Sequence, residues 1–137
     1  MNDLNHHFFL VLVNQSIRLV SNNDLTSSSG IVEIKMNNTW KRMCYHHGWN
    51  MVTAKVACKQ LGYLGALSTG CCGSFPFQPY GGNDQQSVMA NIYCTGEEKF
   101  LGECQFKWSP SIRCDLPNSA GIVCSSKMSY ITIINYQ

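Results

Sequence analysis

The stretch that decides the fold runs from Trp40 to Gly62 and reads W-K-R-M-C-Y-H-H-G-W-N-M-V-T-A-K-V-A-C-K-Q-L-G. A β-prone run over residues 39–45 enters it, and the chain turns at Gly48. From Asn50 onward the apolar residues recur at the three- and four-residue spacing of a helix. We therefore expect one strand followed directly by one helix, with a cysteine on each.

The expected helix spans about residues 51–61. Asn50 suits its N-cap, because an asparagine side chain accepts hydrogen bonds from first-turn N–H groups, and Gly62 can take the left-handed conformation that ends a helix. Cys58 is expected to point into the core, because it falls on the one apolar face of the helix. That face carries Ala54, Ala57, Cys58 and Leu61, whereas Lys55 and Lys59 lie off it.

Outward from this stretch the sequence alternates between strand and loop signals. Strands are expected over residues 17–20, 31–35, 39–45, 88–93 and 121–125, and the Asn37-Asn38 turn joins the second and third of these as a hairpin. Residues 97–101 suit one helical turn, whereas residues 65–82 and the region of Trp108 are expected to be loops. We expect a leader or flexible arm over 1–16, one domain over 17–125 and a tail over 126–137.

The composition indicates an extracellular domain held by disulfide bridges. Only 13% of the 137 residues are charged, against about 25% in typical soluble domains. An even number of widely spaced cysteines favours disulfides in an oxidising compartment, and no C-x2-C spacing supports structural zinc. The eight cysteines are Cys44, Cys58, Cys71, Cys72, Cys94, Cys104, Cys114 and Cys124.

Other sequence signals narrow the class of protein. The net charge of +2 comes from scattered basic residues, which argues against a nucleic-acid partner. No apolar run is long enough to span a membrane. The short apolar run over 8–13 lacks a preceding basic residue and a small-residue cleavage site, so it is a poor signal peptide. Two sequons predict glycosylation at Asn14 and Asn37.

The motifs stand in a characteristic order along the chain. They are I-R-L-V (17–20), G-I-V-E-I (30–34), N-N-T-W (37–40), C-Y-H-H-G-W-N (44–50), A-K-V-A-C-K-Q-L-G (54–62), Y-C-T-G-E-E (93–98), L-G-E-C (101–104), Trp108 and A-G-I-V-C (120–124). Over residues 17–125, about four fifths of the chain, the sequence resembles a scavenger receptor cysteine-rich domain.

The resemblance implies an α+β fold in which a curved antiparallel sheet cradles one main helix. It also implies a six-cysteine framework with the bridges Cys44–Cys114, Cys58–Cys124 and Cys94–Cys104. Cys71 and Cys72 are an additional pair in a region where the family varies. They form either a vicinal bridge that rigidifies the loop or an intermolecular bridge to a partner chain or another copy of this chain.

Many members of the family bind ligands through a cation held by acidic residues. In this chain His46 and His47 replace the first expected acid pair, and Glu98 alone matches an acidic position. A single carboxylate does not hold calcium tightly, so we expect no calcium site. A zinc or copper site from His46, His47 and Glu98 is an alternative, because imidazole suits those metals. A solvated histidine turn is the simpler interpretation.

The expected ligand surface consists of exposed polar and aromatic residues. Lys41 and Arg42 must face opposite sides of their strand, so one of them should be exposed. The predicted ligand-binding residues are Lys41, Arg42, His46, His47, Phe75, Phe77, Tyr80 and Glu98. No catalytic reading holds, because Cys44 is committed to a bridge and neither a G-x-S-x-G turn nor a phosphate-binding loop is present.

We therefore expect a secreted or cell-surface recognition domain, not an enzyme. It should bind extracellular proteins or polyanionic and microbial surfaces, without calcium or another cofactor. Two alternatives stay open: a non-catalytic module of a larger extracellular protease or oxidase, and a component of the extracellular matrix or of cell adhesion. The oligomeric state does not follow from the sequence.

Overall fold

Strand β2 is the central element of the sheet, because it pairs with three other strands. The computed structural model describes residues 17–21, 28–36, 38–46, 49–71, 87–109, 112–115 and 118–127. Strand β2 (Ser29–Met36) pairs antiparallel with β1 (Ile17–Val20), β3 (Thr39–Met43) and β7 (Gly121–Cys124). The predicted hairpin is thus confirmed, and Asn38 turns it with a positive φ of 62°.

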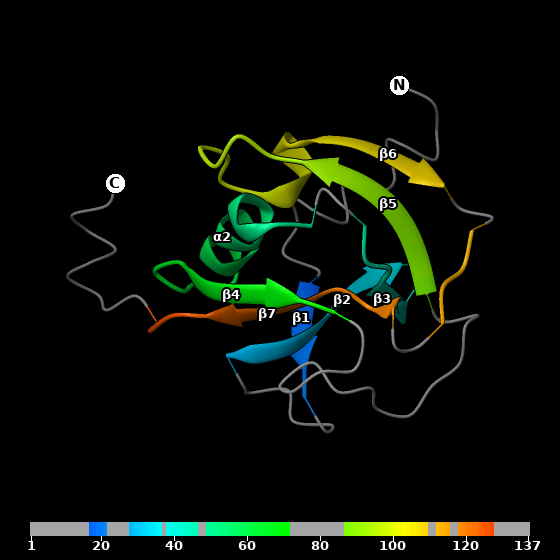
Figure 1. Cartoon of the computed structure of the whole chain (residues 1–137), viewed down its shortest axis with the longest axis horizontal. Coiled ribbons are helices and arrows are strands. Elements are labelled where there is room, and N and C mark those ends of the chain that lie inside the picture. The colour runs from blue at the N-terminus through cyan, green and yellow to red at the C-terminus, as the bar shows by residue number, and fades with distance from the viewer. Residues whose placement is uncertain are drawn as a thin grey trace.

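The whole sheet has seven strands in the order β4-β7-β2-β3-β5-β6, with β1 attached to β2. It is mixed and not purely antiparallel as predicted, because β3 pairs in parallel with β5 (Ser87–Tyr93). The parallel contact arises because the chain crosses from β3 through the helix and β4 before it forms β5. Figure 1 shows the sheet curling around the helix, with β5 and β6 arching over it.

Helix α2 (Met51–Gln60) starts and ends where the sequence predicts. The side-chain oxygen of Asn50 accepts hydrogen bonds from the N–H groups of Val52 at 3.0 Å and Thr53 at 3.2 Å. Gly62 follows the helix with a φ of 95°, a region that favours glycine. Ala54, Ala57 and Cys58 are fully buried, as the apolar face predicts.

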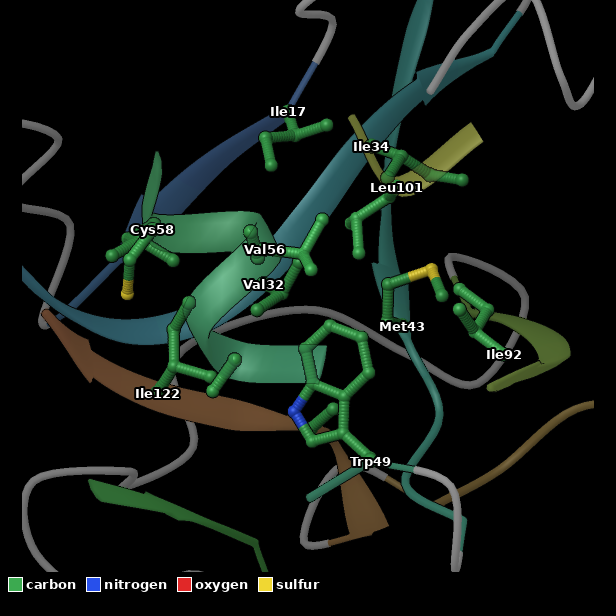
Figure 2. Packing of buried hydrophobic residues seen from close by; sticks show 14 of the residues in the cluster. Ile17, Val32, Ile34, Met43, Trp49, Val56, Cys58, Ile92, Leu101 and Ile122 are labelled. Carbon is green, nitrogen blue, oxygen red and sulfur yellow. The ribbon is translucent and has the colours of Figure 1, made fainter. Parts of the chain in front are cut away.

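The core lies between α2 and the concave side of the sheet (Figure 2). Trp49, which precedes the helix, is its largest fully buried side chain. Around α2 the close view shows side chains from the strands, among them Val32 and Ile34 of β2 and Met43 of β3. Burial of each such side chain contributes about 1.5–3 kcal/mol relative to exposure.

Two strands and one helical turn differ from the prediction. Strands β4 (Ala66–Gly70) and β6 (Gln105–Ser109) lie in regions expected to be loops. Strand β4 pairs with the distant strand β7, whereas β6 pairs with β5, from which residues 94–104 separate it. The helical turn expected at 97–101 is instead the 3-10 turn η2 (Leu101–Glu103). The side-chain oxygen of Gln60 anchors this turn by accepting from the N–H of Leu101 at 2.9 Å.

Candidate functional site

Three disulfide bridges tie the decisive strand and helix to later parts of the chain. Cys44 pairs with Cys114, Cys58 with Cys124, and Cys94 with Cys104. The three pairings implied by the resemblance are therefore present. Cys71 is also disulfide-bonded, but Cys72 lies outside the described residues, so the predicted vicinal bridge stays a prediction.

Arg42 is buried beneath the segment that the first bridge holds, and only 2% of it is exposed. Its Nη1 donates to the Ser119 hydroxyl at 2.9 Å and to the Asp115 carbonyl at 3.2 Å, and its Nη2 donates to the Cys114 carbonyl at 2.9 Å. The prediction that Arg42 contacts a ligand is wrong, because these partners hold the guanidinium inside the protein. Arg42 thereby holds Cys114, Asp115 and Ser119 against β3.

Lys41 lies on the opposite face of β3. It pairs across the hairpin with Ile34, whereas Arg42 pairs with Glu33, so the two basic side chains point to opposite sides as the alternation predicts. Lys41 is half-buried. Of the two predicted residues, only Lys41 therefore stays a candidate for ligand binding.

His46 connects the turn after β3 to the end of β5. Its Nε2 accepts a hydrogen bond from the backbone N–H of Ile92 at 3.1 Å, and its ring meets the Tyr93 ring edge-on with the centroids 5.9 Å apart. An accepting Nε2 places the proton of the neutral imidazole on Nδ1. His46 is thus a half-buried link between two elements and not part of a solvated turn.

Glu98 closes the loop that follows β5. Its carboxylate accepts from the N–H of Thr95 through both oxygens, at 3.1 and 2.9 Å, and from the N–H of Gly96 at 2.9 Å. Burial raises the pKa of this carboxyl, but hydrogen bonds from the backbone N–H groups of Thr95, Glu98 and Gly96 and from the Thr95 hydroxyl outweigh burial. The net result is a pKa below the usual 4.5.

Two of the three predicted metal ligands are described, and backbone groups already occupy both of them. His46 uses Nε2 on Ile92, and Glu98 uses both oxygens on its own loop. Within the described ranges, Glu98 approaches the sulfurs of Cys94 and Cys104 in a potential metal-ligating group. Those sulfurs form a disulfide, whereas a metal requires a thiolate. The third predicted ligand, His47, lies outside the described residues.

An exposed aromatic and acidic surface surrounds the carboxyl end of β5. We call it the β5-end surface and define it by His46, Tyr93, Glu97 and Glu98. Tyr93 is 53% exposed. The acidic side of this surface adjoins an open depression of about 470 Å³ that Thr95, Glu97, Glu98, Lys99 and Glu103 line.

Tyr93 was missed as a candidate ligand residue, although the sequence carries a signal for it. Val88, Ala90 and Ile92 are buried and alternate along β5. Tyr93 falls out of phase with them, and strand alternation therefore directs it to solvent.

Charge is distributed unevenly over the described part of the chain. All ten lysine and arginine residues lie there, together with five of the eight acidic residues. Three of those five acids, Glu97, Glu98 and Glu103, follow β5 closely. Glu33 pairs with Arg18 at 2.7 Å. The β5-end surface is consequently acidic, whereas the remaining described surface has an excess of positive charge.

Several predicted site residues fall outside the described residues, so their roles stay predictions. They are His47, Phe75, Phe77 and Tyr80 among the ligand-binding candidates, and Asn14 and Asn37 among the glycosylation sites.

Comparison with known proteins agrees with the disulfide framework and the curled sheet. The scavenger receptor cysteine-rich domain matches residues 22–125. The chain belongs to this family. The third such domain of murine neurotrypsin superposes with a TM-score of 0.61 and 32% sequence identity, covering 79% of this chain and 94% of that one. The domain of mouse MARCO in its dimeric form superposes with a TM-score of 0.56 and 26% sequence identity, covering 71% of this chain and 86% of that one.

Curated relatives place the scavenger receptor cysteine-rich domain within much longer proteins. A scavenger receptor cysteine-rich domain superfamily protein of Patiria pectinifera is 35% identical over 74% of this chain and 8% of its own length. Lysyl oxidase homolog 2A of Danio rerio is 29% identical over 77% of this chain and 14% of its own length. Galectin-3-binding protein of Mus musculus is 33% identical over 87% of this chain and 19% of its own length. The chain thus spans less than a fifth of each of these relatives.

Membership of the family establishes the general role of this chain. The scavenger receptor cysteine-rich domain is an extracellular recognition module that is generally non-catalytic. It occurs in secreted proteins and in receptor ectodomains. Among the described residues of this chain, no helix is long and apolar enough to cross a membrane.

Proposed function

We propose that this scavenger receptor cysteine-rich domain recognises an extracellular protein or polyanionic ligand without a bound metal ion and catalyses no reaction. One observation carries the proposal: the two described residues at the expected cation positions already have backbone partners. His46 accepts from Ile92, and Glu98 accepts from Thr95 and Gly96. A calcium ion needs six to eight oxygen ligands, and both carboxylate oxygens of Glu98 already accept the hydrogen bonds that close its loop.

The β5-end surface suits a protein ligand better than a polyanion. Tyr93 offers a large exposed aromatic side chain, and aromatic residues are enriched where proteins bind one another. Glu97, Glu98 and Glu103 would repel a sulfated or phosphorylated polymer. A polyanion would instead bind where the basic residues lie, for example along the exposed side of α2 that carries Lys55 and Lys59.

The metal-free mode is tested with two measurements on the same purified protein. Calorimetric titration with calcium chloride and with zinc chloride should show no saturable binding. Binding to immobilised dextran sulfate, the polyanionic probe, should persist in EDTA and weaken with added salt, because screening acts on the basic residues. Loss of binding in EDTA, or stoichiometric uptake of either metal, would contradict the proposal.

The two ligand classes are separated by matched charge and aromatic variants. Lys55→Glu with Lys59→Glu should weaken dextran sulfate binding, whereas Tyr93→Ser should leave it unchanged. Tyr93→Ser should instead reduce capture of protein ligands from extracellular extracts. If the unmodified protein does not bind dextran sulfate at all, the polyanion is excluded and the protein ligand remains.

A second candidate function is a non-catalytic module of a larger extracellular enzyme. The match to lysyl oxidase homolog 2A favours it, because this chain corresponds to only 14% of that protein. Sequencing the complete transcript decides this question. An oxidase or protease domain in the same reading frame would support this candidate, and a frame that encodes only recognition domains would exclude it.

A further inference from the structure

The edge strand β4 exposes a large apolar side chain. Within the described residues β4 pairs with β7 and ends the order of strands. Leu67, at the irregularity in register between Ala66 and Ser68, is 66% exposed, and Leu64 just before the strand is 44% exposed. An edge strand offers backbone N–H and C=O groups that readily pair with another strand.

An apolar groove lies between β4 and α2. Met51, Val52, Lys55, Gly65 and Ala66 line it, and its volume is about 370 Å³. Met51 and Val52 are 44% and 38% exposed, although they begin a helix whose other face is fully buried. Figure 1 shows α2 beside β4, and the groove joins the first turn of the helix to Gly65 and Ala66 at the start of this strand. A strand added along β4 would adjoin this groove.

The chain carries a segment with matching chemistry after β7. Residues 128–137 read M-S-Y-I-T-I-I-N-Y-Q and contain no charged residue. Residues 130–134 are all aromatic or β-branched, as preferred in strands. An uncharged segment of this composition promotes aggregation if it stays exposed. Both the open edge of β4 and this segment promote aggregation when exposed, and pairing between them would bury both.

The segment leaves the described structure next to the start of β4. Lys127 bridges to Tyr63, and the Leu64 N–H donates to the Ser126 carbonyl at 2.9 Å. Lys127 lies opposite Tyr63, three residues before Ala66, so the chain must return about 10 Å along the strand and cross two strand spacings, about 10 Å, which is a path of about 14 Å. The four Cα–Cα steps from Lys127 to residue 131 cover about 14 Å when extended. Residues 131–137 then extend about 23 Å, compared with about 17 Å for the five residues of β4.

We propose that residues 131–136 add to the open edge of β4 as a further strand and cover the groove over Met51 and Val52. The segment would run parallel to β4, because it turns back from β7 and β4 is antiparallel to β7. The alternative occupants are the same segment of a second copy and residues 72–86, which follow β4.

The proposal is tested on the full chain by backbone hydrogen exchange at residues 67–70. Two variants remove the interaction: a chain ending after Lys127, and Ile133→Asp combined with Ile134→Asp, which places a charge on each face of the segment. Ser129→Asp, in the connecting residues, is the matched control. We expect the first two variants to exchange β4 amides about tenfold faster, with exchange in β5 unchanged, and the control to behave like the unmodified chain.

A synthetic peptide of residues 128–137 adds an independent readout. It should restore slow exchange in β4 when added to the truncated chain. Analytical ultracentrifugation shows whether the segment comes from the same chain or from a second copy. The proposal requires that the protein with slow exchange in β4 be a monomer. Equal exchange in all variants would overturn the proposal in favour of residues 72–86, and protection only in a dimer would overturn it in favour of a second copy.

Discussion

Replacing Arg42 by lysine should lower the free energy of unfolding by about 3 kcal/mol, although the positive charge is kept. The guanidinium donates to three oxygen acceptors, the carbonyls of Cys114 and Asp115 and the hydroxyl of Ser119, at 2.9, 3.2 and 2.9 Å. A compact ammonium group on a lysine cannot reproduce this planar fork, so at least one bond is lost and an acceptor stays buried. Hydrogen bonds to charged groups contribute about 1.5–3 kcal/mol each, and loss of one or two gives the stated value.

The measurement is denaturant unfolding with the disulfides intact, followed by tryptophan fluorescence, because Trp49 is fully buried. Arg113→Lys is the matched control: it makes the same chemical change at an exposed arginine and should alter the free energy of unfolding by less than about 0.5 kcal/mol. Equal unfolding free energies for Arg42→Lys and the control would refute the conclusion that Arg42 holds Cys114, Asp115 and Ser119 against β3.

Three further predictions follow from local geometry. Asn50→Ala should cost about 1 kcal/mol in denaturant unfolding, because the N–H groups of Val52 and Thr53 lose their acceptor; no change would contradict the cap. Gly30→Ala should prevent normal pairing of β1 with β2, because Gly30 has a φ of 147° and the added Cβ would lie 2.4 Å from the Val20 carbonyl oxygen. Unchanged NMR chemical shifts of the β1 amides would disprove this. Glu98 has a lowered pKa in the folded protein, so its carboxylate stabilises the fold above pH 4.5, and this contribution disappears as the pH falls through the folded pKa. The stability advantage over Glu98→Gln should therefore shrink below pH 4.5, and an advantage independent of pH would exclude this role.

The elements built from local signals were predictable. Asn50 and Gly62 mark the ends of α2 because capping and left-handed conformations depend on a few adjacent residues. The β2–β3 hairpin follows from the Asn37-Asn38 turn for the same reason. Strand β4 was not predictable, because its sequence contains few strand signals and its hydrogen bonds come from the distant strand β7. Strand β6 was missed although Phe106 and Trp108 alternate with polar residues, which is a strand pattern.

Some features of the candidate site were likewise predictable from the sequence, whereas others depend on contacts between distant residues. The replacement of the expected acids by His46 and His47 is visible in the sequence and suggests recognition without calcium. The hydrogen bond from Ile92 to His46 is not visible, since 46 residues separate its two partners. Arg42 was misassigned for a related reason: alternation says which way its side chain points, but not that Cys114 and Asp115 lie against that face.

By itself, the sequence determined the family, the caps of the helix and the cysteines available for bridging, because motif order and capping are written in neighbouring residues. The tertiary structure decided which face of β3 is accessible, which loop segments become strands and what His46 and Glu98 bind. Those outcomes depend on contacts between residues far apart in the chain, and no local pattern encodes such contacts. The stretch from Trp40 to Gly62 illustrates both, because its helix was foreseeable whereas the burial of Arg42 and the link through His46 were not.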